Sequence, residues 1–204
     1  MEAFYTVNET TTRELTAEKS RFIGIAVPVT SQKQTSEAMA EIRERYPDAR
    51  HYVYAYRLYD GRIEKSSDDG EPQGTGGRPV LDLLQHRNVW NVLLVVVRYF
   101  GGVLLGTGGL TRAYGGAARL VITGAELKKL TLYAVWRLDV PYEWFEPLKH
   151  RINLREWKII EEEFLETVRF KVLIPCQEAV LFTDWVADST GKKAWCEYVH
   201  DVWA

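Results

Sequence analysis

The first residues that could do chemistry form an acidic loop. Asp68, Asp69 and Glu71 place three carboxylates within four positions, and Gly70 and Pro72 give the segment the composition of a turn. Carboxylates in a turn could bind a cation such as Mg²⁺, but the alternating oxygen ligands and the closing glutamate of an EF-hand are absent. We expect a structured loop that faces a ligand rather than a metal centre, with a solvated acidic turn as the alternative.

The second candidate is a glycine-rich segment between an apolar run and an expected helix. It contains Gly101, Gly102, Gly106, Gly108 and Gly109. Exposed main-chain N–H groups and the helix dipole favour an anion at such a place. The pair of glycines at 106 and 108 matches half of a dinucleotide fingerprint, but position 111 is not glycine, and the Gly-Lys-Ser/Thr of a P-loop is absent.

Arginine carries every positive charge between Lys65 and Lys128. The arginines of this region and its border are Arg62, Arg78, Arg87, Arg98, Arg112 and Arg119. Because a guanidinium group binds phosphate or carboxylate through two hydrogen bonds, we expect Arg78, Arg98 and Arg112 to form an anion-binding surface with the five glycines. The alternative is that the arginines pair with nearby acidic residues, namely Asp68, Asp69, Glu71 and Asp82, and only tie loops together.

No complete catalytic set is evident, and we expect no catalytic residue, no metal and no cofactor. Hydroxyl groups are present at Ser66, Ser67, Thr75, Thr107 and Thr111, but this half of the chain has only two histidines and no nucleophile-elbow motif. His51 is interpreted as a hydrogen-bonded structural histidine. Cys176 and Cys196 are interpreted as small apolar fillers.

The elements that must position these residues can be read from the apolar pattern. Residues 31–34 form a possible capping box, and Gly115 and Gly116 each cost a helix about 1 kcal/mol relative to Ala, which predicts close packing of another backbone. The apolar run within 91–100 predicts a strand buried on both faces. The expected order is a strand at 21–29, a helix that ends at Pro47, a strand at 51–59, a loop at 66–77, a helix at 79–86, a strand at 91–100 and a helix after 109.

The pattern changes from Thr131 onward and predicts a second domain. The expected elements are a strand at 132–140, a helix at 143–154, strands at 157–163 and 166–174, a helix from Pro175 to about 189 and a strand at 194–203. This β-α-β-β-α-β order is the ferredoxin-like arrangement. We therefore expect an α+β protein with domains at 1–128 and 129–204.

Composition and charge exclude several classes of protein. The 204 residues carry a net charge of −2, divided as +2 over residues 1–129 and −4 over residues 130–204. Neither part is a basic stripe that would drive bulk duplex binding. No apolar stretch approaches the roughly 20 residues that span a bilayer, and the two cysteines form no redox pair. We expect a cytoplasmic protein without membrane contact.

Several of these segments together resemble the IMPACT family, including its YigZ-like bacterial members. They are Lys19-Ser20-Arg21-Phe22, the acidic loop with Gly74-Thr75, and residues 97–102 with Gly109-Leu110 and Arg112-Ala113-Tyr114. Family members often carry His-x-Cys near the second strand, whereas Val53 follows His51-Tyr52 here, so no thiol role applies. The resemblance implies an N-terminal α/β domain like domain IV of elongation factor G and a C-terminal ferredoxin-like domain like its domain V.

The resemblance also implies a role linked to translation. Eukaryotic relatives regulate translation by competing for the activator of a stress-response kinase. We expect a non-enzymatic regulatory or binding protein whose Gly/Arg-rich surface contacts RNA phosphate or a protein partner. The ribosome, RNA or a translation-related protein would be that partner, and the oligomeric state is left open. The alternative is a metal-assisted enzyme that acts on a small phosphorylated substrate.

Overall fold

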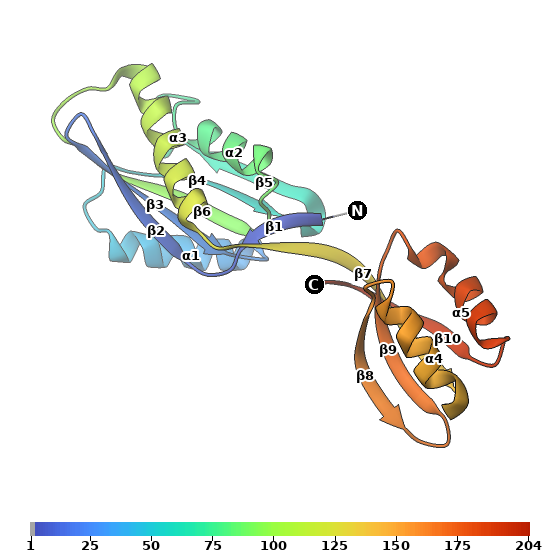
Figure 1. Cartoon of the computed structure of the whole chain (residues 1–204). Coiled ribbons are helices and arrows are strands. Elements are labelled where there is room, and N and C mark those ends of the chain that lie inside the picture. The colour runs from blue at the N-terminus through green and yellow to red at the C-terminus, as the bar shows by residue number, and fades with distance from the viewer. Residues whose placement is uncertain (1–2) are drawn as a thin grey trace. The chain divides into compact units, whose positions relative to one another are not determined.

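The computed structural model describes residues 3–204, which divide into two compact units. The N-terminal unit comprises residues 4–129, and the C-terminal unit comprises residues 130–204 together with Ala3. The strands form two five-stranded sheets (Figure 1), so the expected α+β class is confirmed. The boundary expected between residues 128 and 129 falls inside strand β7 (Leu127–Val140) rather than in a loop.

The sheet of the N-terminal unit is antiparallel throughout and is centred on β6 (Val92–Tyr99). Every residue from Val92 to Val97 is fully buried. Val92, Leu94 and Val96 face one core, and the residues between them face the other, as expected for a strand covered on both sides. The strand order is β2 (Thr11–Ala17), β3 (Ser20–Pro28), β6, β4 (His51–Leu58) and β5 (Ile63–Ser67).

Helices cover both faces of this sheet (Figure 1). Helices α2 (Gly77–His86) and α3 (Gly106–Gly124) pack on one face, and α1 (Gln32–Arg45) packs on the other. The expected cap of α1 is present, because Ser31 Oγ accepts the N–H of Gln34 at 3.2 Å. The return bond differs from the standard capping box: the Gln34 side chain accepts the N–H of Thr30 at 2.7 Å.

Three strands were not predicted from the sequence. They are β1 (Ala3–Val7), which pairs with β7, and the two edge strands β2 and β5. The edge strands are held by main-chain hydrogen bonds while most of their side chains are partly or fully exposed. They therefore show little of the apolar alternation that marks a half-buried strand.

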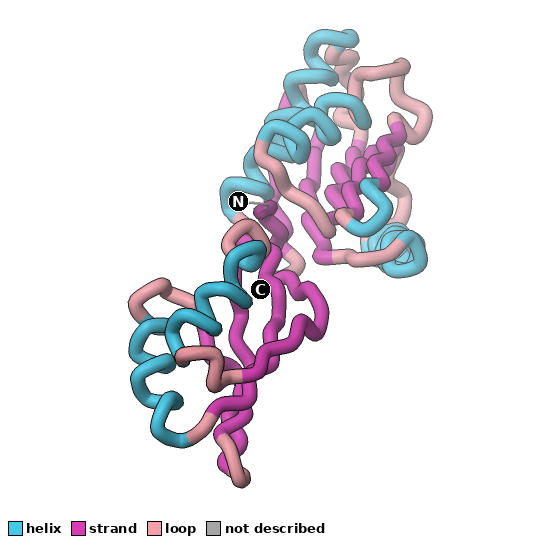
Figure 2. Tube along the Cα trace, turned by 90° about the vertical axis from the view of Figure 1, so that its right-hand side faces the viewer, coloured by secondary structure: helices cyan, strands magenta, loops and turns pink. Residues whose placement is uncertain are grey.

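The C-terminal unit has the predicted ferredoxin-like order. After β7 come α4 (Tyr142–Asn153), β8 (Lys158–Phe164), β9 (Val168–Pro175), α5 (Phe182–Thr190) and β10 (Trp195–Trp203). The strand order is β10, β7, β9 and β8. The helices and strands of this unit form two layers (Figure 2) with a common apolar core. Pro175 ends β9 instead of opening the last helix, which begins after a 3₁₀ turn at Ala179–Leu181.

No helix within residues 3–204 combines the length and the apolar character that a membrane crossing requires.

Candidate functional site

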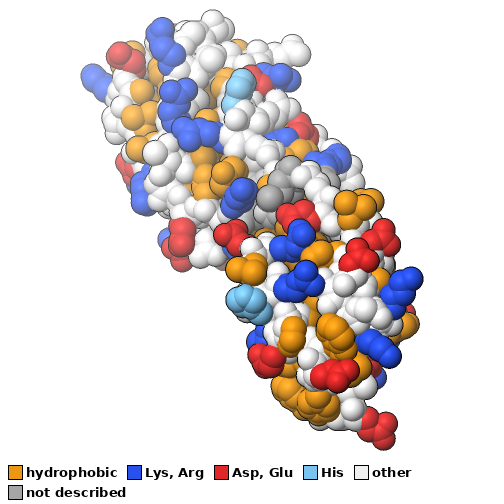
Figure 3. Space-filling view, turned by 45° about the vertical axis from the view of Figure 1, so that its right-hand side comes forward, with side chains coloured by type: hydrophobic (Ala, Val, Ile, Leu, Met, Phe, Trp, Pro, Cys, Tyr) orange, Lys and Arg blue, Asp and Glu red, His pale blue; other side chains and the backbone are white. Residues whose placement is uncertain are grey.

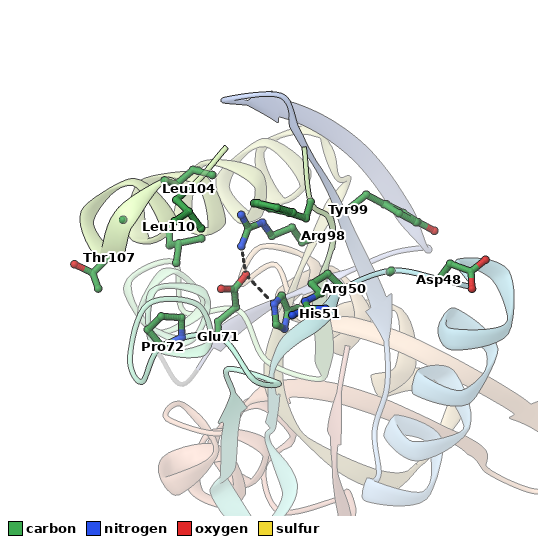
Figure 4. A pocket seen from close by; sticks show the side chains of 14 residues that line it. Asp48, Arg50, His51, Glu71, Pro72, Arg98, Tyr99, Leu104, Thr107 and Leu110 are labelled. Carbon is green, nitrogen blue, oxygen red and sulfur yellow. Dashed lines mark hydrogen bonds and ion pairs between the residues drawn. The ribbon is translucent and has the colours of Figure 1, made fainter. Parts of the chain in front are cut away.

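The acidic loop and the glycine-rich segment meet at one open cavity of the N-terminal unit (Figure 4). The cavity measures about 1030 Å³ and is lined by residues from both segments, including Glu71, Pro72, Gly106 and Thr107. The two segments are some thirty residues apart in the sequence. They come together because β5, β4 and β6 are neighbours in the sheet, and β5 and β6 each lead into one of the loops.

A buried ion pair forms the floor of this cavity. Arg98 Nη1 donates to Glu71 Oε1 at 2.5 Å, and the two side chains are only 6% and 4% exposed. The Arg98 guanidinium also lies over two aromatic rings, 5.5 Å from the centroid of Phe22 and 5.4 Å from that of Phe100. Arg98 Nε is buried and has no hydrogen-bond partner within residues 3–204.

Two further side chains fix the buried pair. The hydroxyl of Tyr114, a fully buried residue of α3, donates to Glu71 Oε1 at 2.7 Å. Burial raises the pKa of Tyr114, and its hydrogen bond to Glu71 raises it further, so this phenol stays protonated. Ser20 Oγ lies 3.4 Å from Arg98 Nη2 and accepts the N–H of Gly101 at 3.2 Å.

His51 borders the same carboxylate. Its Nδ1 lies 2.8 Å from the carbonyl oxygen of Asp69, which can only accept, so Nδ1 carries the proton. Its Nε2 then faces Glu71 Oε1 at 3.6 Å. The expected hydrogen-bonded histidine is therefore present, but it also lines the cavity.

The carboxylates of the two aspartates in the acidic loop are engaged by hydrogen bonds and an ion pair within the protein itself. Asp68 accepts the main-chain N–H groups of Gly74, Gly76 and Gly77 at 2.8–2.9 Å. Burial acts to raise the pKa of Asp68, but these three hydrogen bonds outweigh it, so the pKa is lowered.

Asp69 is engaged in the same way. Its carboxylate accepts the N–H of Tyr52 at 2.7 Å and pairs with Arg43 at 3.0 Å. Of the three carboxylates in the acidic loop, only Glu71 lines the cavity. Across residues 3–204, no group of three or more His, Cys, Asp or Glu side chains is arranged to hold a metal ion.

The structure does not bring the three predicted arginines together. Arg98 lies in the floor of the cavity, whereas the exposed Arg78 pairs with Asp82 at 2.7 Å. Arg112 lines a different cavity. The helix geometry explains its position. Leu110 of α3 faces the first cavity, and Arg112, two residues further along the helix, points about 200° away from Leu110 around the helix axis.

The five predicted glycines have different environments. A Cβ on Gly101 would lie 2.0 Å from the main chain of Lys19, whereas one on Gly102, Gly106 or Gly108 would meet nothing within 4 Å. Gly102 and Gly106 have φ values of 83° and 67°, which favour glycine. Gly109 packs against the side chain of Leu105. Gly106 lines the cavity at the start of α3.

The expectation for Gly115 and Gly116 was wrong. The nearest neighbours of a Cβ at these positions are side chains, at 3.8 Å and 3.3 Å, and not another backbone. The close backbone approach to α3 occurs at Gly24 of β3, where a Cβ would lie 2.9 Å from the carbonyl oxygen of Ala117. Gly115 and Gly116 instead line the second cavity.

This second cavity, the arginine groove, lies between α2 and α3 and measures about 780 Å³. Its basic residues are His86, Arg87, Arg112 and Arg119. Within the described chain, none of these three arginines forms an ion pair, and the single acidic residue of the lining, Asp82, is paired with Arg78. Basic side chains also gather on the visible face of this unit in the space-filling view (Figure 3).

The fold and the site together define the class of protein. It has two α+β units, and the first unit carries two separate features, namely a cavity with a buried ion pair in its floor and the arginine groove. Residues 18–122 match the model of the Impact N-terminal domain, and residues 138–192 match a domain of unknown function, DUF1949. The chain belongs to the IMPACT family, as its motifs predicted.

Relatives with similar sequences cover most of the chain. The IMPACT family member YvyE of Bacillus subtilis is 30% identical over 95% of this chain and 90% of its own, and YigZ of Escherichia coli is 32% identical over 84% and 85%. Protein IMPACT of Homo sapiens is 37% identical over 45% of this chain and 30% of its own. A solved structure titled "Crystal structure of an hypothetical protein" matches with a TM-score of 0.63 and 29% identity over 98% of both chains.

Sequence reasoning missed two of the residues that build the floor. Ser20 was noted only in a family motif, and Tyr114 only in a family motif and on the apolar face of the helix expected after residue 109, yet both are fully buried and hydrogen-bonded at the site. A polar side chain inside an apolar helical stripe was the available signal for Tyr114, since a buried hydroxyl needs a partner.

Proposed function

We propose that this protein is a non-enzymatic, translation-linked binding protein of the cytoplasm that contacts RNA phosphate through the arginine groove. Membership of the IMPACT family favours a regulatory or binding role. The observation that carries the proposal is the set of three exposed arginines, Arg87, Arg112 and Arg119, that line one groove without an ion pair in the described chain.

The chemistry of the groove suits a phosphate backbone. Guanidinium groups bind phosphate oxygens through two hydrogen bonds, and they keep their charge at every physiological pH. Gly115 and Gly116 line the groove without side chains of their own, and at Gly115 the nearest neighbour of a Cβ would be Pro79 at 3.8 Å, so a ligand can approach the helix surface at Gly115. The near-neutral net charge of residues 1–129 means that binding depends on this local cluster and not on the charge of the whole unit.

The two other readings have less support. An acidic protein surface would also pair with the groove, but it offers fewer anionic groups per unit length than RNA does. The metal-assisted enzyme gains no support from the relatives, and the two aspartates that it requires are engaged by main-chain N–H groups and by Arg43.

The test is a titration of the purified protein against ribosomes and against structured RNA at two salt concentrations. The variants are Arg112→Gln and Arg119→Gln. Arg45→Gln is the matched control, because Arg45 is an exposed arginine of α1, which packs on the opposite face of the sheet. Each groove variant is expected to weaken binding and to reduce the slope of log K against log salt by about 0.7–0.9 for each phosphate that it no longer neutralises.

The outcomes separate the readings. Weaker RNA binding by both groove variants, with the control unchanged, supports the proposal. Parent-like RNA binding by both groove variants would remove the arginine groove as the site. If the protein binds a ribosomal protein but shows no affinity for RNA, a protein partner would be favoured instead.

A further inference from the structure

The cavity floored by Arg98 and Glu71 is separate from the arginine groove, and RNA contact in the groove leaves it unused. We propose that this cavity binds an uncharged sugar ring, whose neighbouring hydroxyl groups donate to Glu71 and His51 while its C–H face packs on Phe100. The ligand class is a ring with two adjacent hydroxyls and no net charge, either in a free saccharide or in the ribose of a nucleoside.

One oxygen of the buried carboxylate supplies the first indication of a ligand. All three side-chain contacts of Glu71, from Arg98, Tyr114 and His51, are made to Oε1. Within residues 3–204, Oε2 has no hydrogen bond and is not among the polar atoms sealed from solvent, so it opens to the cavity although the side chain is only 4% exposed. Figure 4 shows this oxygen on the side of the carboxylate that faces away from Arg98 and His51. A buried acceptor that the protein itself leaves unpaired is satisfied by a donor on a ligand.

The ring of His51 places a second acceptor beside this carboxylate. Its Nδ1 donates to the carbonyl oxygen of Asp69 at 2.8 Å, so Nε2 carries a lone pair. This Nε2 lies 3.6 Å from Glu71 Oε1, and both atoms are acceptors. His51 also lines the cavity, with 14% of its side chain exposed. Two hydroxyls on adjacent carbons of one ligand supply two donors for these neighbouring acceptors.

The charges of the lining favour an uncharged ligand. Asp48 and Glu71 supply two negative charges, and Arg50 and Arg98 supply two positive ones. An anion would be repelled by the open oxygen of Glu71, and a cation would be repelled by the Arg98 guanidinium, whose Nη1 lies 2.5 Å from the same carboxylate. A hydroxyl group donates a hydrogen bond without a net charge, so it avoids both repulsions.

Another part of the lining is apolar and suits the C–H face of a sugar ring. Phe100 is 47% exposed and Leu104 is 88% exposed, and both line the cavity together with Leu105 and Leu110. The face of an aromatic ring carries partial negative charge, so C–H groups polarised by neighbouring oxygens pack favourably against it. The volume of about 1030 Å³ is at the upper end of the range for small-molecule sites, so a sugar ring with a substituent fits.

Isothermal titration calorimetry with D-glucose and adenosine tests the assignment. Saturable binding by one or both is expected, and the one that binds more tightly identifies a free saccharide or a nucleoside as the source of the sugar. Tetrahydropyran and 2′,3′-dideoxyadenosine keep the rings but lack the adjacent hydroxyls, so each should bind at least about ten-fold more weakly than its parent. D-glucosamine, D-glucose 6-phosphate and adenosine monophosphate carry a charge and should bind no more tightly than the uncharged parents.

Two variants test the residues. In His51→Asn the amide can donate to the Asp69 carbonyl from about the position of Nδ1 but lacks the Nε2 acceptor, so the melting temperature should hold while affinity falls about five-fold. Phe100→Ala removes the exposed ring and should weaken binding about ten-fold. Phe164→Ala is the matched control, because it removes a ring of similar exposure, 57%, from β8 of the C-terminal unit and should leave binding unchanged.

Four results would overturn the proposal. The first is the lack of saturable binding by both D-glucose and adenosine up to about 10 mM. The second is equal binding by the compounds that lack the hydroxyls, and the third is tighter binding by a charged form. The fourth is parent-like affinity in both His51→Asn and Phe100→Ala. None of these results bears on the arginine groove, whose test uses Arg112 and Arg119.

Discussion

Glu71 Oε1 lies 2.5 Å from Arg98 Nη1, and both side chains are almost completely buried. The two residues come from segments 27 positions apart, the acidic loop and the end of β6. A buried ion pair adds little net stability relative to an apolar replacement, but loss of one partner leaves an uncompensated buried charge. The pair therefore fixes the loop to the sheet at the floor of the cavity.

Removal of the arginine should be strongly destabilising. Arg98→Ala is expected to lower the free energy of unfolding by about 3–5 kcal/mol, because Glu71 would remain buried without its partner. Urea unfolding measures the effect. Arg21→Ala is the control, since Arg21 forms an exposed pair with Glu14 and its loss should change stability far less. Equal effects of the two substitutions would contradict the burial argument.

The hydroxyl of Tyr114 should make its own contribution to the stability of the protein at the same site. Tyr114→Phe keeps the packed ring, which meets Phe22 edge-on with centroids 5.2 Å apart, and deletes only the donor to Glu71. We expect a decrease in stability of about 1–3 kcal/mol, the cost of leaving a buried acceptor with one hydrogen bond fewer. Tyr142→Phe is a suitable control, because its hydroxyl bonds a main-chain oxygen at an exposed site. An unchanged urea midpoint in Tyr114→Phe would argue against the hydrogen bond.

Asp68 should make stability depend on pH in the acid range. Its pKa is lowered in the folded state from the ordinary value of 3.8, since three main-chain N–H donors outweigh the opposing effect of burial. Its contribution is therefore complete above that ordinary value and is lost as the pH falls through the lower, folded-state pKa. Asp68→Asn should be less stable than the parent near neutral pH, and the difference should shrink below the ordinary value. A difference that stays constant throughout would disprove the assignment.

The sequence predicts those helices and strands whose pattern of apolar and polar side chains reflects which faces are buried. The unbroken apolar run of β6 indicates a strand with two covered faces, and Ser31 with Gln34 indicates where α1 begins. β2 and β5 escape prediction because edge strands are specified by main-chain pairing, and their exposed side chains carry little pattern.

The site is less predictable than the fold, for a related reason. The spacing of Asp68, Asp69 and Glu71 shows three similar carboxylates, and only the folded loop directs two of them to main-chain N–H groups and the third to Arg98. The same holds for Arg112, whose position around the axis of α3 takes it away from Arg98. Direction within a loop or around a helix depends on tertiary packing that residue spacing does not contain.

Two glycines of the glycine-rich segment should respond in opposite ways to the same substitution. In Gly101→Ala the new Cβ would lie 2.0 Å from the main chain of Lys19, so β3 and the loop after β6 must move apart, at a cost of about 1–3 kcal/mol or more. In Gly108→Ala the Cβ enters open space in a helix, which should raise stability by up to about 1 kcal/mol.

Thermal and urea unfolding of both variants measure this contrast, and each variant serves as the control for the other, because both replace the same residue type in the same segment. The close approach at Gly101 also holds its N–H against Ser20 Oγ, so its substitution should loosen the hydrogen bond between Ser20 and Arg98. Hydrogen exchange at the amide of residue 101 would detect that loosening. Unfolding curves that shift in the same direction for the two variants would refute the geometry assigned to this segment.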